Sequence, residues 1–323
     1  MSHGTHIEIP GGYTEAKETA AFIVRRDRRF LRVFGRDPVK MVQGLITNDL
    51  AGAPENRSVY AAMLTPKGRM IADMRLFRRG PDVLIETDAD AADNIAAHLK
   101  KFVPPLFARS EDASAKWGVL TVAGPEAARV LERLTGAQVS AEENVISGSG
   151  DLIAVGGRLP GSIDVIAPAA EVERLGDELA HAGVAPLDHR AYEVLRVEAG
   201  IPAWAAELDD TVIPLEAGLR HELISETKGC YTGQEVIIRI LHRGHVNRHL
   251  RGLLLGDRRP PGKGTPLFNA DGKNVGMITS SVRSPARQQT IALGYVRREI
   301  VPPATLHLDE PGGSIVHVVE LPF

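Results

Sequence analysis

The chain has 323 residues, 43% hydrophobic and 24% charged, a composition typical of a soluble globular protein with more than one core. Its 38 basic and 41 acidic residues give a formal net charge of −3, so overall charge indicates neither a nucleic-acid-binding protein nor an acidic tail. A single cysteine excludes an intramolecular disulfide framework. No apolar run approaches the ~20 residues that cross a bilayer, and the polar N-terminus lacks the apolar core of a signal peptide. We therefore expect a cytoplasmic protein, monomeric and without membrane contact.

Strand-like and helix-like segments alternate over the first 112 residues. Asp37 and Pro38 provide an N-cap and a first-turn proline for a short helix. Two apolar runs flank Thr65-Pro66-Lys67-Gly68, which predicts a β-hairpin. We predict a first α+β lobe over residues 1–112, with strands at 29–35, 58–65, 69–78 and 82–88 and a helix at 89–102.

A second round of strands and helices follows, although no residue-level repeat relates it to the first. The helix at 188–200 is expected to begin at the N-cap Asp188 and to end at Gly200. We predict a second α+β lobe over residues 113–246, with strands at 117–124 and 162–167 and helices at 125–134, 169–183 and 188–200.

The last part of the chain consists of short β-rich runs separated by glycine and proline at close intervals. This pattern is typical of a small antiparallel barrel or sandwich. We predict such a domain over residues 247–323, after a boundary at about 241–247. The predicted fold class is therefore α+β with a C-terminal β domain.

The segment KGCYTGQE (228–235) contains the only cysteine, Cys230. A lone cysteine usually behaves as a small buried hydrophobe. However, Lys228 lies two residues away and would stabilise a thiolate, and Gly229 and Gly233 allow tight turns or close approach to a ligand. Gln234 and Glu235 add polar groups, so this segment is a candidate functional site.

Glu198 is the second candidate. Ala191, Val194 and Leu195 precede it by seven, four and three residues, which places its carboxylate on the apolar face of its helix. A buried carboxylate must be paired or hydrogen-bonded. Its partner is either an arginine, such as Arg196 or Arg220, or a ligand with adjacent N–H donors, such as the amino-pyrimidine edge of a pterin.

Weaker signals come from Asp73, Asn48 and Asp49. Asp73 lies in an apolar strand, where it is either a ligand-facing carboxylate or an outward, solvated one, and the residues alone favour the solvated position. Asn48 and Asp49 follow a predicted short helix and are expected in a turn.

The run RILHRGHVNRHLR (239–251) is rich in arginine and histidine. It is either a solvated connector between domains or a cationic surface for the carboxylate tail of a folate or for RNA phosphates. His245 and His249 have the spacing of a helical metal-ligand pair, but no third ligand is in register, so we predict no metal site.

KGCYTGQE followed by Arg239 resembles the signature of the YgfZ-type folate-binding proteins, which are related to the glycine-cleavage T-protein, an aminomethyltransferase. The resemblance covers about residues 30–300. The other matching blocks are VQGLITNDL (42–50), AAMLTPKGRMIADMRLF (61–77), LRVEAGIP (195–202), NVGMITSS (274–281) and ALGYVRR (292–298).

The resemblance implies a three-lobed fold around a central cavity that binds tetrahydrofolate. It assigns Glu198 to the pterin and places Cys230 and Lys228 in the same cavity. It also implies a role in iron–sulfur cluster assembly or repair and in tRNA modification, with iron–sulfur assembly proteins or their clients as partners. Within the matching blocks, the predicted folate-binding residues besides Glu198 are Asn48, Met63, Tyr231, Gln234, Glu235 and Arg239.

The chain departs from the T-protein at one important position. Where the T-protein has two adjacent aspartates, one of them near the reactive folate nitrogen, this chain has Ala72 and Asp73. Two hypotheses follow: a folate-dependent maintenance factor for iron–sulfur proteins that uses Cys230, or a one-carbon (aminomethyl) transferase that requires Asp73 and Glu198 but not Cys230. An RNA-binding scaffold is the third and weakest alternative.

Overall fold

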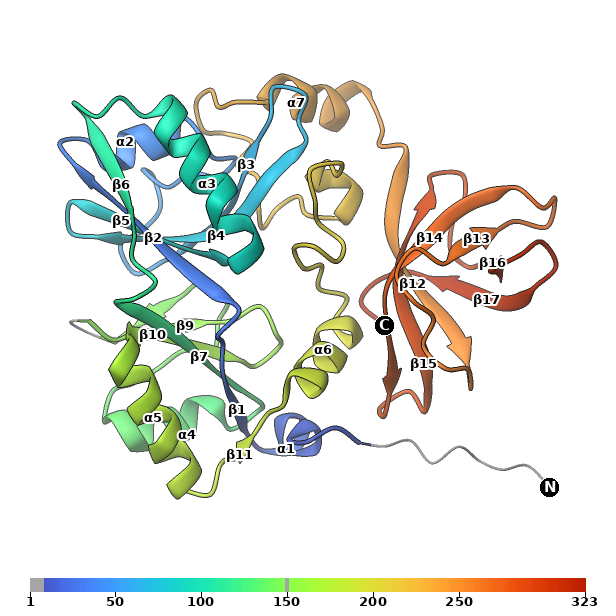
Figure 1. Cartoon of the computed structure of the whole chain (residues 1–323), viewed down its shortest axis with the longest axis horizontal. Coiled ribbons are helices and arrows are strands. Elements are labelled where there is room, and N and C mark those ends of the chain that lie inside the picture. The colour runs from blue at the N-terminus through green and yellow to red at the C-terminus, as the bar shows by residue number, and fades with distance from the viewer. Residues whose placement is uncertain (1–8, 149–150) are drawn as a thin grey trace.

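The computed structural model describes residues 9–148 and 151–323 and arranges them in three lobes (Figure 1). Two α+β lobes lie on one side, a β-barrel lies on the other, and helix α6 (His189–Glu198) lies between them. The predicted α+β class with a C-terminal antiparallel barrel is therefore confirmed.

The first lobe is a five-stranded antiparallel sheet with the order β3-β4-β5-β2-β6. The predicted hairpin is present, and Gly68 in its turn has a φ of 73°, which favours glycine. Apolar side chains of α2 and α3 cover one face of the sheet. The elements are β2 (Arg28–Gly35), α2 (Pro38–Gln43), β3 (Val59–Leu64), β4 (Met70–Arg79), β5 (Asp82–Asp88), α3 (Ala89–Phe102) and β6 (Ala108–Asp112).

The second lobe is a six-stranded sheet with the order β11-β1-β7-β10-β9-β8, and helices α4 and α5 pack on one of its faces. Strand β1, from the N-terminal part of the chain, pairs with β7 and β11, so the chain passes through this sheet before it builds the first lobe. The elements are β1 (Ala21–Val24), β7 (Trp117–Ala123), α4 (Ala127–Thr135), β8 (Ile146–Ser147), β9 (Ile153–Gly156), β10 (Ile163–Pro168), α5 (Ala169–His181) and β11 (Ala185–Pro186).

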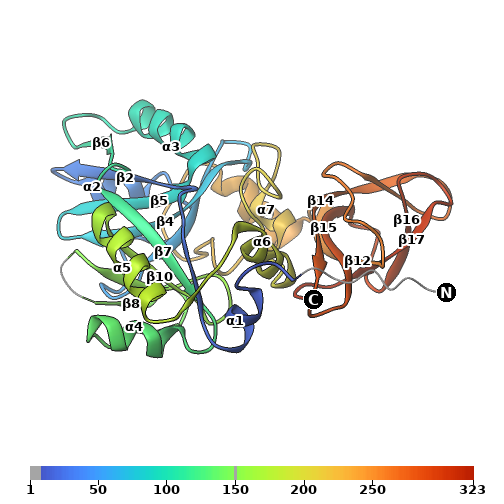
Figure 2. The same cartoon turned by 60° about the horizontal axis from the view of Figure 1, so that its bottom comes forward.

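The two sheets pack against each other on the faces that their helices leave uncovered (Figure 2). The contact contains Phe30 and Phe77 from the first lobe and Trp117, Val155 and Ile166 from the second. Because each sheet is covered on both faces, its central strands are buried without alternation, as in β5, whose five inner residues are all buried.

The C-terminal lobe is a closed six-stranded barrel with the strand order β12-β15-β14-β13-β16-β17. A closed barrel has no unpaired edge strand, and side chains such as Leu253, Ile278 and Val316 fill its interior. The strands are β12 (Arg248–Gly256), β13 (Pro266–Phe268), β14 (Asn274–Ser284), β15 (Gln289–Arg297), β16 (Ala304–Leu308) and β17 (Ser314–Val319).

Three further elements connect the lobes: α1 (Tyr13–Glu18), the 3₁₀ helix η1 (Pro214–Ala217) and α7 (Gln234–Arg243). One apolar cluster joins all three lobes, with contributions from Tyr13, Tyr60, Val194, Ile237 and Tyr295. Among the described residues, no helix is both long and apolar enough to cross a bilayer. The lobe boundaries at 112/113 and 246/247 stay predictions.

Candidate functional site

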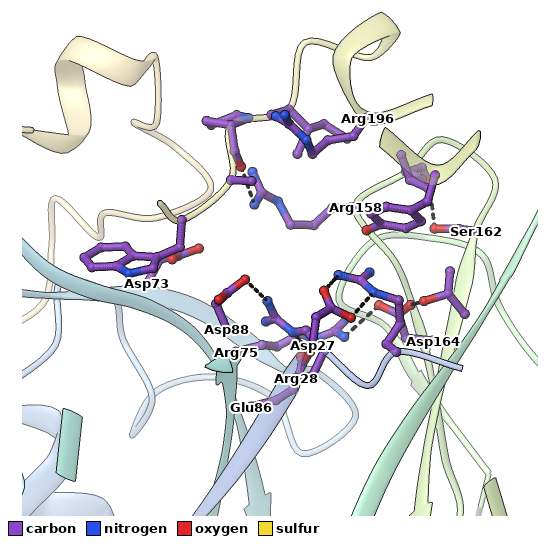
Figure 3. Close-up of a pocket in the computed structure, with 18 of the residues that line it drawn as sticks. Asp27, Arg28, Asp73, Arg75, Glu86, Asp88, Arg158, Ser162, Asp164 and Arg196 are labelled. Carbon is purple, nitrogen blue, oxygen red and sulfur yellow. Dashed lines mark hydrogen bonds and ion pairs between the residues drawn. The ribbon is translucent and has the colours of Figure 1, made fainter. Parts of the chain in front are cut away.

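A cavity of about 410 Å³ lies between the two sheets and the segment that follows α6 (Figure 3). This volume is within the usual range of small-molecule sites. Aromatic side chains line it together with many charged groups. Its arginines are Arg25, Arg28, Arg75, Arg158 and Arg196, its carboxylates are Asp27, Asp73, Glu86, Asp88, Asp164 and Glu193, and its aromatic residues include Tyr60, Tyr192 and Trp204.

Most of these charges belong to an ion-pair network at the floor of the cavity. Glu86 on β5 accepts hydrogen bonds from Arg28 Nε (2.7 Å) and from Arg75 Nε (2.9 Å). Arg75 also donates to Asp164 of the other sheet (2.7 Å), which ties the two lobes together. Burial alone would raise the pKa of Glu86, but the two arginines outweigh it and lower the pKa to about 2. The network is therefore charged and internally paired at neutral pH.

Asp73 stands apart from this network. Its Oδ2 accepts a hydrogen bond of 2.7 Å from the hydroxyl of Tyr60, and its Oδ1 has no donor among the described residues. The side chain is buried and lines the cavity, so the expectation of an outward, solvated position is wrong. The neighbour Ala72 packs into the core of the first lobe, because successive residues of a strand face opposite sides.

Arg158 lies in the turn between β9 and β10 and lines the cavity, although the sequence did not predict it as a site residue. Its guanidinium stacks 4.5 Å from the centre of the Tyr60 ring and donates one long hydrogen bond to the carbonyl of Pro202 (3.4 Å). The only local signal was an arginine among closely spaced glycines, in GGRLPG (156–161), which also describes an ordinary turn.

Glu198 is nearly buried, as predicted from its helix face, but it does not line this cavity. Its carboxylate accepts hydrogen bonds from the hydroxyl of Tyr13 on α1 (2.8 and 2.9 Å) and from Ser284 Oγ on β14 (2.5 Å), and it lies 3.7 Å from Lys17 Nζ. The alternative of an ion pair with Arg196 or Arg220 is wrong, because these arginines pair with other glutamates.

Lys228 is buried and faces the loop that follows α2. Its Nζ donates to the carbonyls of Gln43 (2.6 Å), Ile46 (2.7 Å) and Asn48 (3.0 Å), which uses all three donors of the ammonium group. Burial lowers the pKa of Lys228 to about 8. No donor is left for a thiolate at Cys230, so the lysine ties two segments of the chain together.

Cys230 is exposed, so the usual expectation of a buried cysteine is wrong here. Neither Cys230 nor Lys228 lines the central cavity, contrary to the expectation from the resemblance. Of the two flanking glycines, Gly229 has open space around it. Gly233 has a φ of 84°, and a Cβ there would lie 2.6 Å from the carbonyl oxygen of Thr65. This glycine lets the start of α7 pack on the β3–β4 hairpin.

The remaining predicted folate-binding residues lie outside the cavity lining. Asn48 donates to the carbonyls of Tyr60 (2.9 Å) and Glu222 (3.0 Å), and Met63 is fully buried in the first lobe. Tyr231 is buried, its hydroxyl has no partner among the described residues, and burial raises its pKa to about 12. At the start of α7, Gln234 is half-buried and Glu235 exposed, and Arg239 is exposed further along the helix.

The basic run at 239–251 is divided between two elements. Arg239 lies in α7, whereas His249 lies in β12 and His245 in the link between them. The two histidines therefore lack the helical spacing that suggested a metal pair. Arg248 and Arg251 of this run form ion pairs with Glu216 and Glu320.

The three-lobed fold corresponds to a known class of protein. Residues 24–149 match the family described as the GCVT N-terminal domain, and residues 248–323 match the glycine cleavage T-protein C-terminal barrel domain. The fold resembles the crystal structure of the glycine cleavage system aminomethyltransferase T from Bartonella henselae, with a TM-score of 0.86, 20% identity, and coverage of 96% of this chain and 88% of that one.

Relatives that match most of the chain in sequence agree with the two family matches. The chain is 30% identical over 272 residues to an aminomethyltransferase of Rubrobacter xylanophilus, which covers 82% of this chain and 73% of the relative. It is 29% identical over 319 residues to an aminomethyltransferase of Geobacillus kaustophilus, and this match covers 91% of this chain and 85% of the relative. The chain belongs to the glycine cleavage T-protein family.

Proposed function

We propose that this protein binds a reduced folate in the central cavity. The observation that carries the proposal is Asp73, a buried residue of the cavity wall whose Oδ1 accepts no hydrogen bond from the described residues. A buried carboxylate oxygen needs hydrogen-bond donors, and the amino-pyrimidine edge of a pterin offers adjacent N–H groups. The aromatic side chains of Tyr60 and Trp204 supply apolar surface for a flat ring. These residues fit tetrahydrofolate or a derivative.

The role that we propose for the folate-bound protein is the maintenance of iron–sulfur proteins, as in the YgfZ-type branch of the family. Two features support this branch: the resemblance of KGCYTGQE to its signature, and the exposure of Cys230, whose thiol a partner protein can reach. Lys228 and Gly233 fix the segment that carries the thiol to the first lobe. An effect on tRNA modification would follow through iron–sulfur enzymes, without direct RNA contact.

A strain in which Cys230→Ser replaces the wild type tests this role. We expect the activity of cluster-containing enzymes to fall under oxidative stress, as in a deletion strain, while the level of the protein is unchanged. Gly229→Ala is the matched control, because it alters the adjacent residue in open space. Normal cluster-enzyme activities in both the deletion and the Cys230→Ser strain would refute the maintenance role.

Aminomethyl transfer is the second candidate, and the orientation of Asp73 favours it. In the resemblance to the T-protein, Ala72 and Asp73 occupy the positions of two adjacent aspartates. Ala72 faces the core, so the carboxylate that this chain retains is the one that faces the cavity. Formation of methylene-tetrahydrofolate from an aminomethylated carrier protein would establish this reaction, provided that Asp73→Asn abolishes it and Cys230→Ser does not.

A further inference from the structure

Arg158 differs from the other arginines of the cavity. Arg25 pairs with Asp27, Arg28 and Arg75 pair with Glu86, and Arg196 pairs with Glu193 and Glu207. Within residues 9–148 and 151–323, Arg158 forms no ion pair, and its single hydrogen bond is the long one to Pro202 (Figure 3). The nearby carboxylate of Glu143 feels its charge, which partly offsets the rise in the pKa of Glu143 that burial causes. A guanidinium carries five N–H donors, so most of its hydrogen-bonding capacity faces the cavity unused.

The turn that carries Arg158 is fixed by its own hydrogen bonds. Gly157 N donates to the carbonyl of Ser162 (2.9 Å), and Ser162 Oγ donates to the carbonyl of Leu159 (2.7 Å). Ser162 is buried, and a Cβ at Gly157 would lie 2.3 Å from its Oγ, so the turn packs too tightly for a larger residue at 157. The backbone that carries Arg158 is thus fixed before any ligand binds, which reduces the entropic cost of binding.

Tyr60 joins Arg158 to the carboxylate of Asp73. The face of its ring lies against the guanidinium at 4.5 Å, and its hydroxyl donates to Asp73 Oδ2 at 2.7 Å. The ring partly stabilises the unpaired cation, but it supplies no acceptor for the free N–H groups. The cavity therefore offers an unfilled acceptor at Asp73 and an unfilled cationic donor at Arg158, separated by one aromatic ring.

We propose that Arg158 binds the carboxylate of the ligand in this cavity. A carboxylate matches the fork of a guanidinium with two parallel hydrogen bonds, and it would give Arg158 the ion-pair partner that the described residues do not supply. The proposal rests on the proposed folate function for its ligand. The carboxylate belongs either to the glutamate of the folate or to a separate small molecule bound beside it.

The test compares a reduced folate with an analogue in which an uncharged amide replaces the glutamate. 5-Formyltetrahydrofolate and 5-formyltetrahydropteroamide, which ends in a benzamide and carries no carboxylate, are titrated into the wild type, Arg158→Gln and Arg129→Gln by calorimetry. Arg129 is the matched control, because it belongs to the same lobe but lies on the exposed side of α4, paired with Glu126. We expect Arg158→Gln to weaken folate binding by roughly tenfold and to leave the binding of the pteroamide unchanged.

A second arm identifies a separate carboxylate. Glycine is titrated into the folate-saturated wild type and into folate-saturated Arg158→Gln. Weaker binding of glycine to the variant, with both folate affinities unchanged, supports the proposal and assigns the carboxylate to a second molecule. Unchanged affinities for all three compounds would overturn it, and so would an equal loss for the folate and the pteroamide, which would place Arg158 at the part that the two compounds share.

The failure of the proposed function gives a different result. If the wild type binds neither reduced folate, the folate proposal falls. Titration of glycine into the ligand-free wild type and Arg158→Gln then decides the role of Arg158: a loss in the variant supports it, and no difference contradicts it. Thermal unfolding of each variant confirms that these comparisons concern folded protein.

Discussion

Lys228 shows how a single charged side chain can organise this fold. Its ammonium group is surrounded by three backbone carbonyls of the loop that follows α2. The loop is thereby attached to the segment 228–235 from the far end of the sequence. A lysine in this setting stabilises the fold through charge-assisted hydrogen bonds, even though burial lowers its pKa to about 8.

Lys228→Met should therefore destabilise the protein, because it leaves three carbonyls without their donor. We expect a loss of roughly 3 kcal/mol in the free energy of unfolding, measured with urea. Gly229→Ala, next to it in open space, should change the stability by less than about 0.5 kcal/mol. A Lys228→Met protein as stable as Gly229→Ala would contradict the structural role of the lysine.

The lowered pKa of Glu86 leads us to expect that the free energy of unfolding depends on pH. Arg28 and Arg75 lower its pKa to about 2, against an ordinary value of 4.5. A lowered carboxyl pKa contributes stability that is present above pH 4.5 and is lost as the pH falls toward 2. The difference in the free energy of unfolding between the wild type and Glu86→Gln should therefore shrink over this range, by roughly 3 kcal/mol.

The exposed pair Arg26–Glu173 provides the comparison for Glu86. Exposed ion pairs contribute about 0–1 kcal/mol, so Glu173→Gln should follow the wild-type pH profile closely. A constant difference between the wild type and Glu86→Gln from pH 5 to pH 2 would show that Glu86 has an ordinary pKa in the folded protein.

At the scale of elements, the contact between α7 and the β3–β4 hairpin depends on Gly233. The residue has a φ of 84° and approaches the carbonyl of Thr65 closely. Gly233→Ala should destabilise the protein by roughly 2 kcal/mol, because an alanine is strained at this φ and its Cβ meets the backbone. Thermal unfolding beside Gly229→Ala measures the effect, and equal stability of the two variants would refute it.

Local patterns predicted many of the elements correctly. Helical spacing predicted α3 and α5, the Pro66–Gly68 turn predicted the β3–β4 hairpin, and Asp188 caps α6 through a hydrogen bond to Ala191 N (2.6 Å). Short elements without a period of their own, such as β8 and β11, were not predicted. They form because neighbouring strands supply their hydrogen bonds.

The helix face of Glu198 illustrates where local reasoning ended. Its spacing from Val194 and Leu195 correctly predicted a nearly buried carboxylate. Its partners, Tyr13 and Ser284, lie 185 and 86 residues away in the sequence. No local pattern indicates contacts over such separations. The two predicted partners, an arginine or a ligand, therefore did not include the tyrosine and serine hydroxyls that bind Glu198 in the structure.

At the scale of the whole molecule, α6 connects all three lobes. Glu198 accepts hydrogen bonds from Tyr13 of α1 and from Ser284 of the barrel. Arg196 on the same helix donates hydrogen bonds to Glu207 (2.8 Å) and to Ser280 of β14 (2.8 Å). Arg196 also lines the cavity. The position of the barrel is therefore coupled to the wall of the cavity through one helix.

The cavity itself was the least predictable part of the molecule. It forms where two sheets meet, and Arg75 and Asp164, which face each other there, come from different lobes. Of the ten predicted site residues, Asp73 is the one that lines it. The assignments of Cys230 and Glu198 came from a local motif and a helix face, neither of which specifies which surfaces enclose a common space.

One measurement tests the central claim most directly: calorimetric titration of 5-formyltetrahydrofolate into the wild type, Asp73→Asn and Glu198→Gln. The asparagine keeps the shape of the side chain and removes the charge that faces the cavity. We expect Asp73→Asn to weaken binding by roughly tenfold or more, and folded Glu198→Gln to bind within about threefold of the wild type. Unchanged affinity in Asp73→Asn, with a large loss in Glu198→Gln, would contradict the account and place the pterin at Glu198.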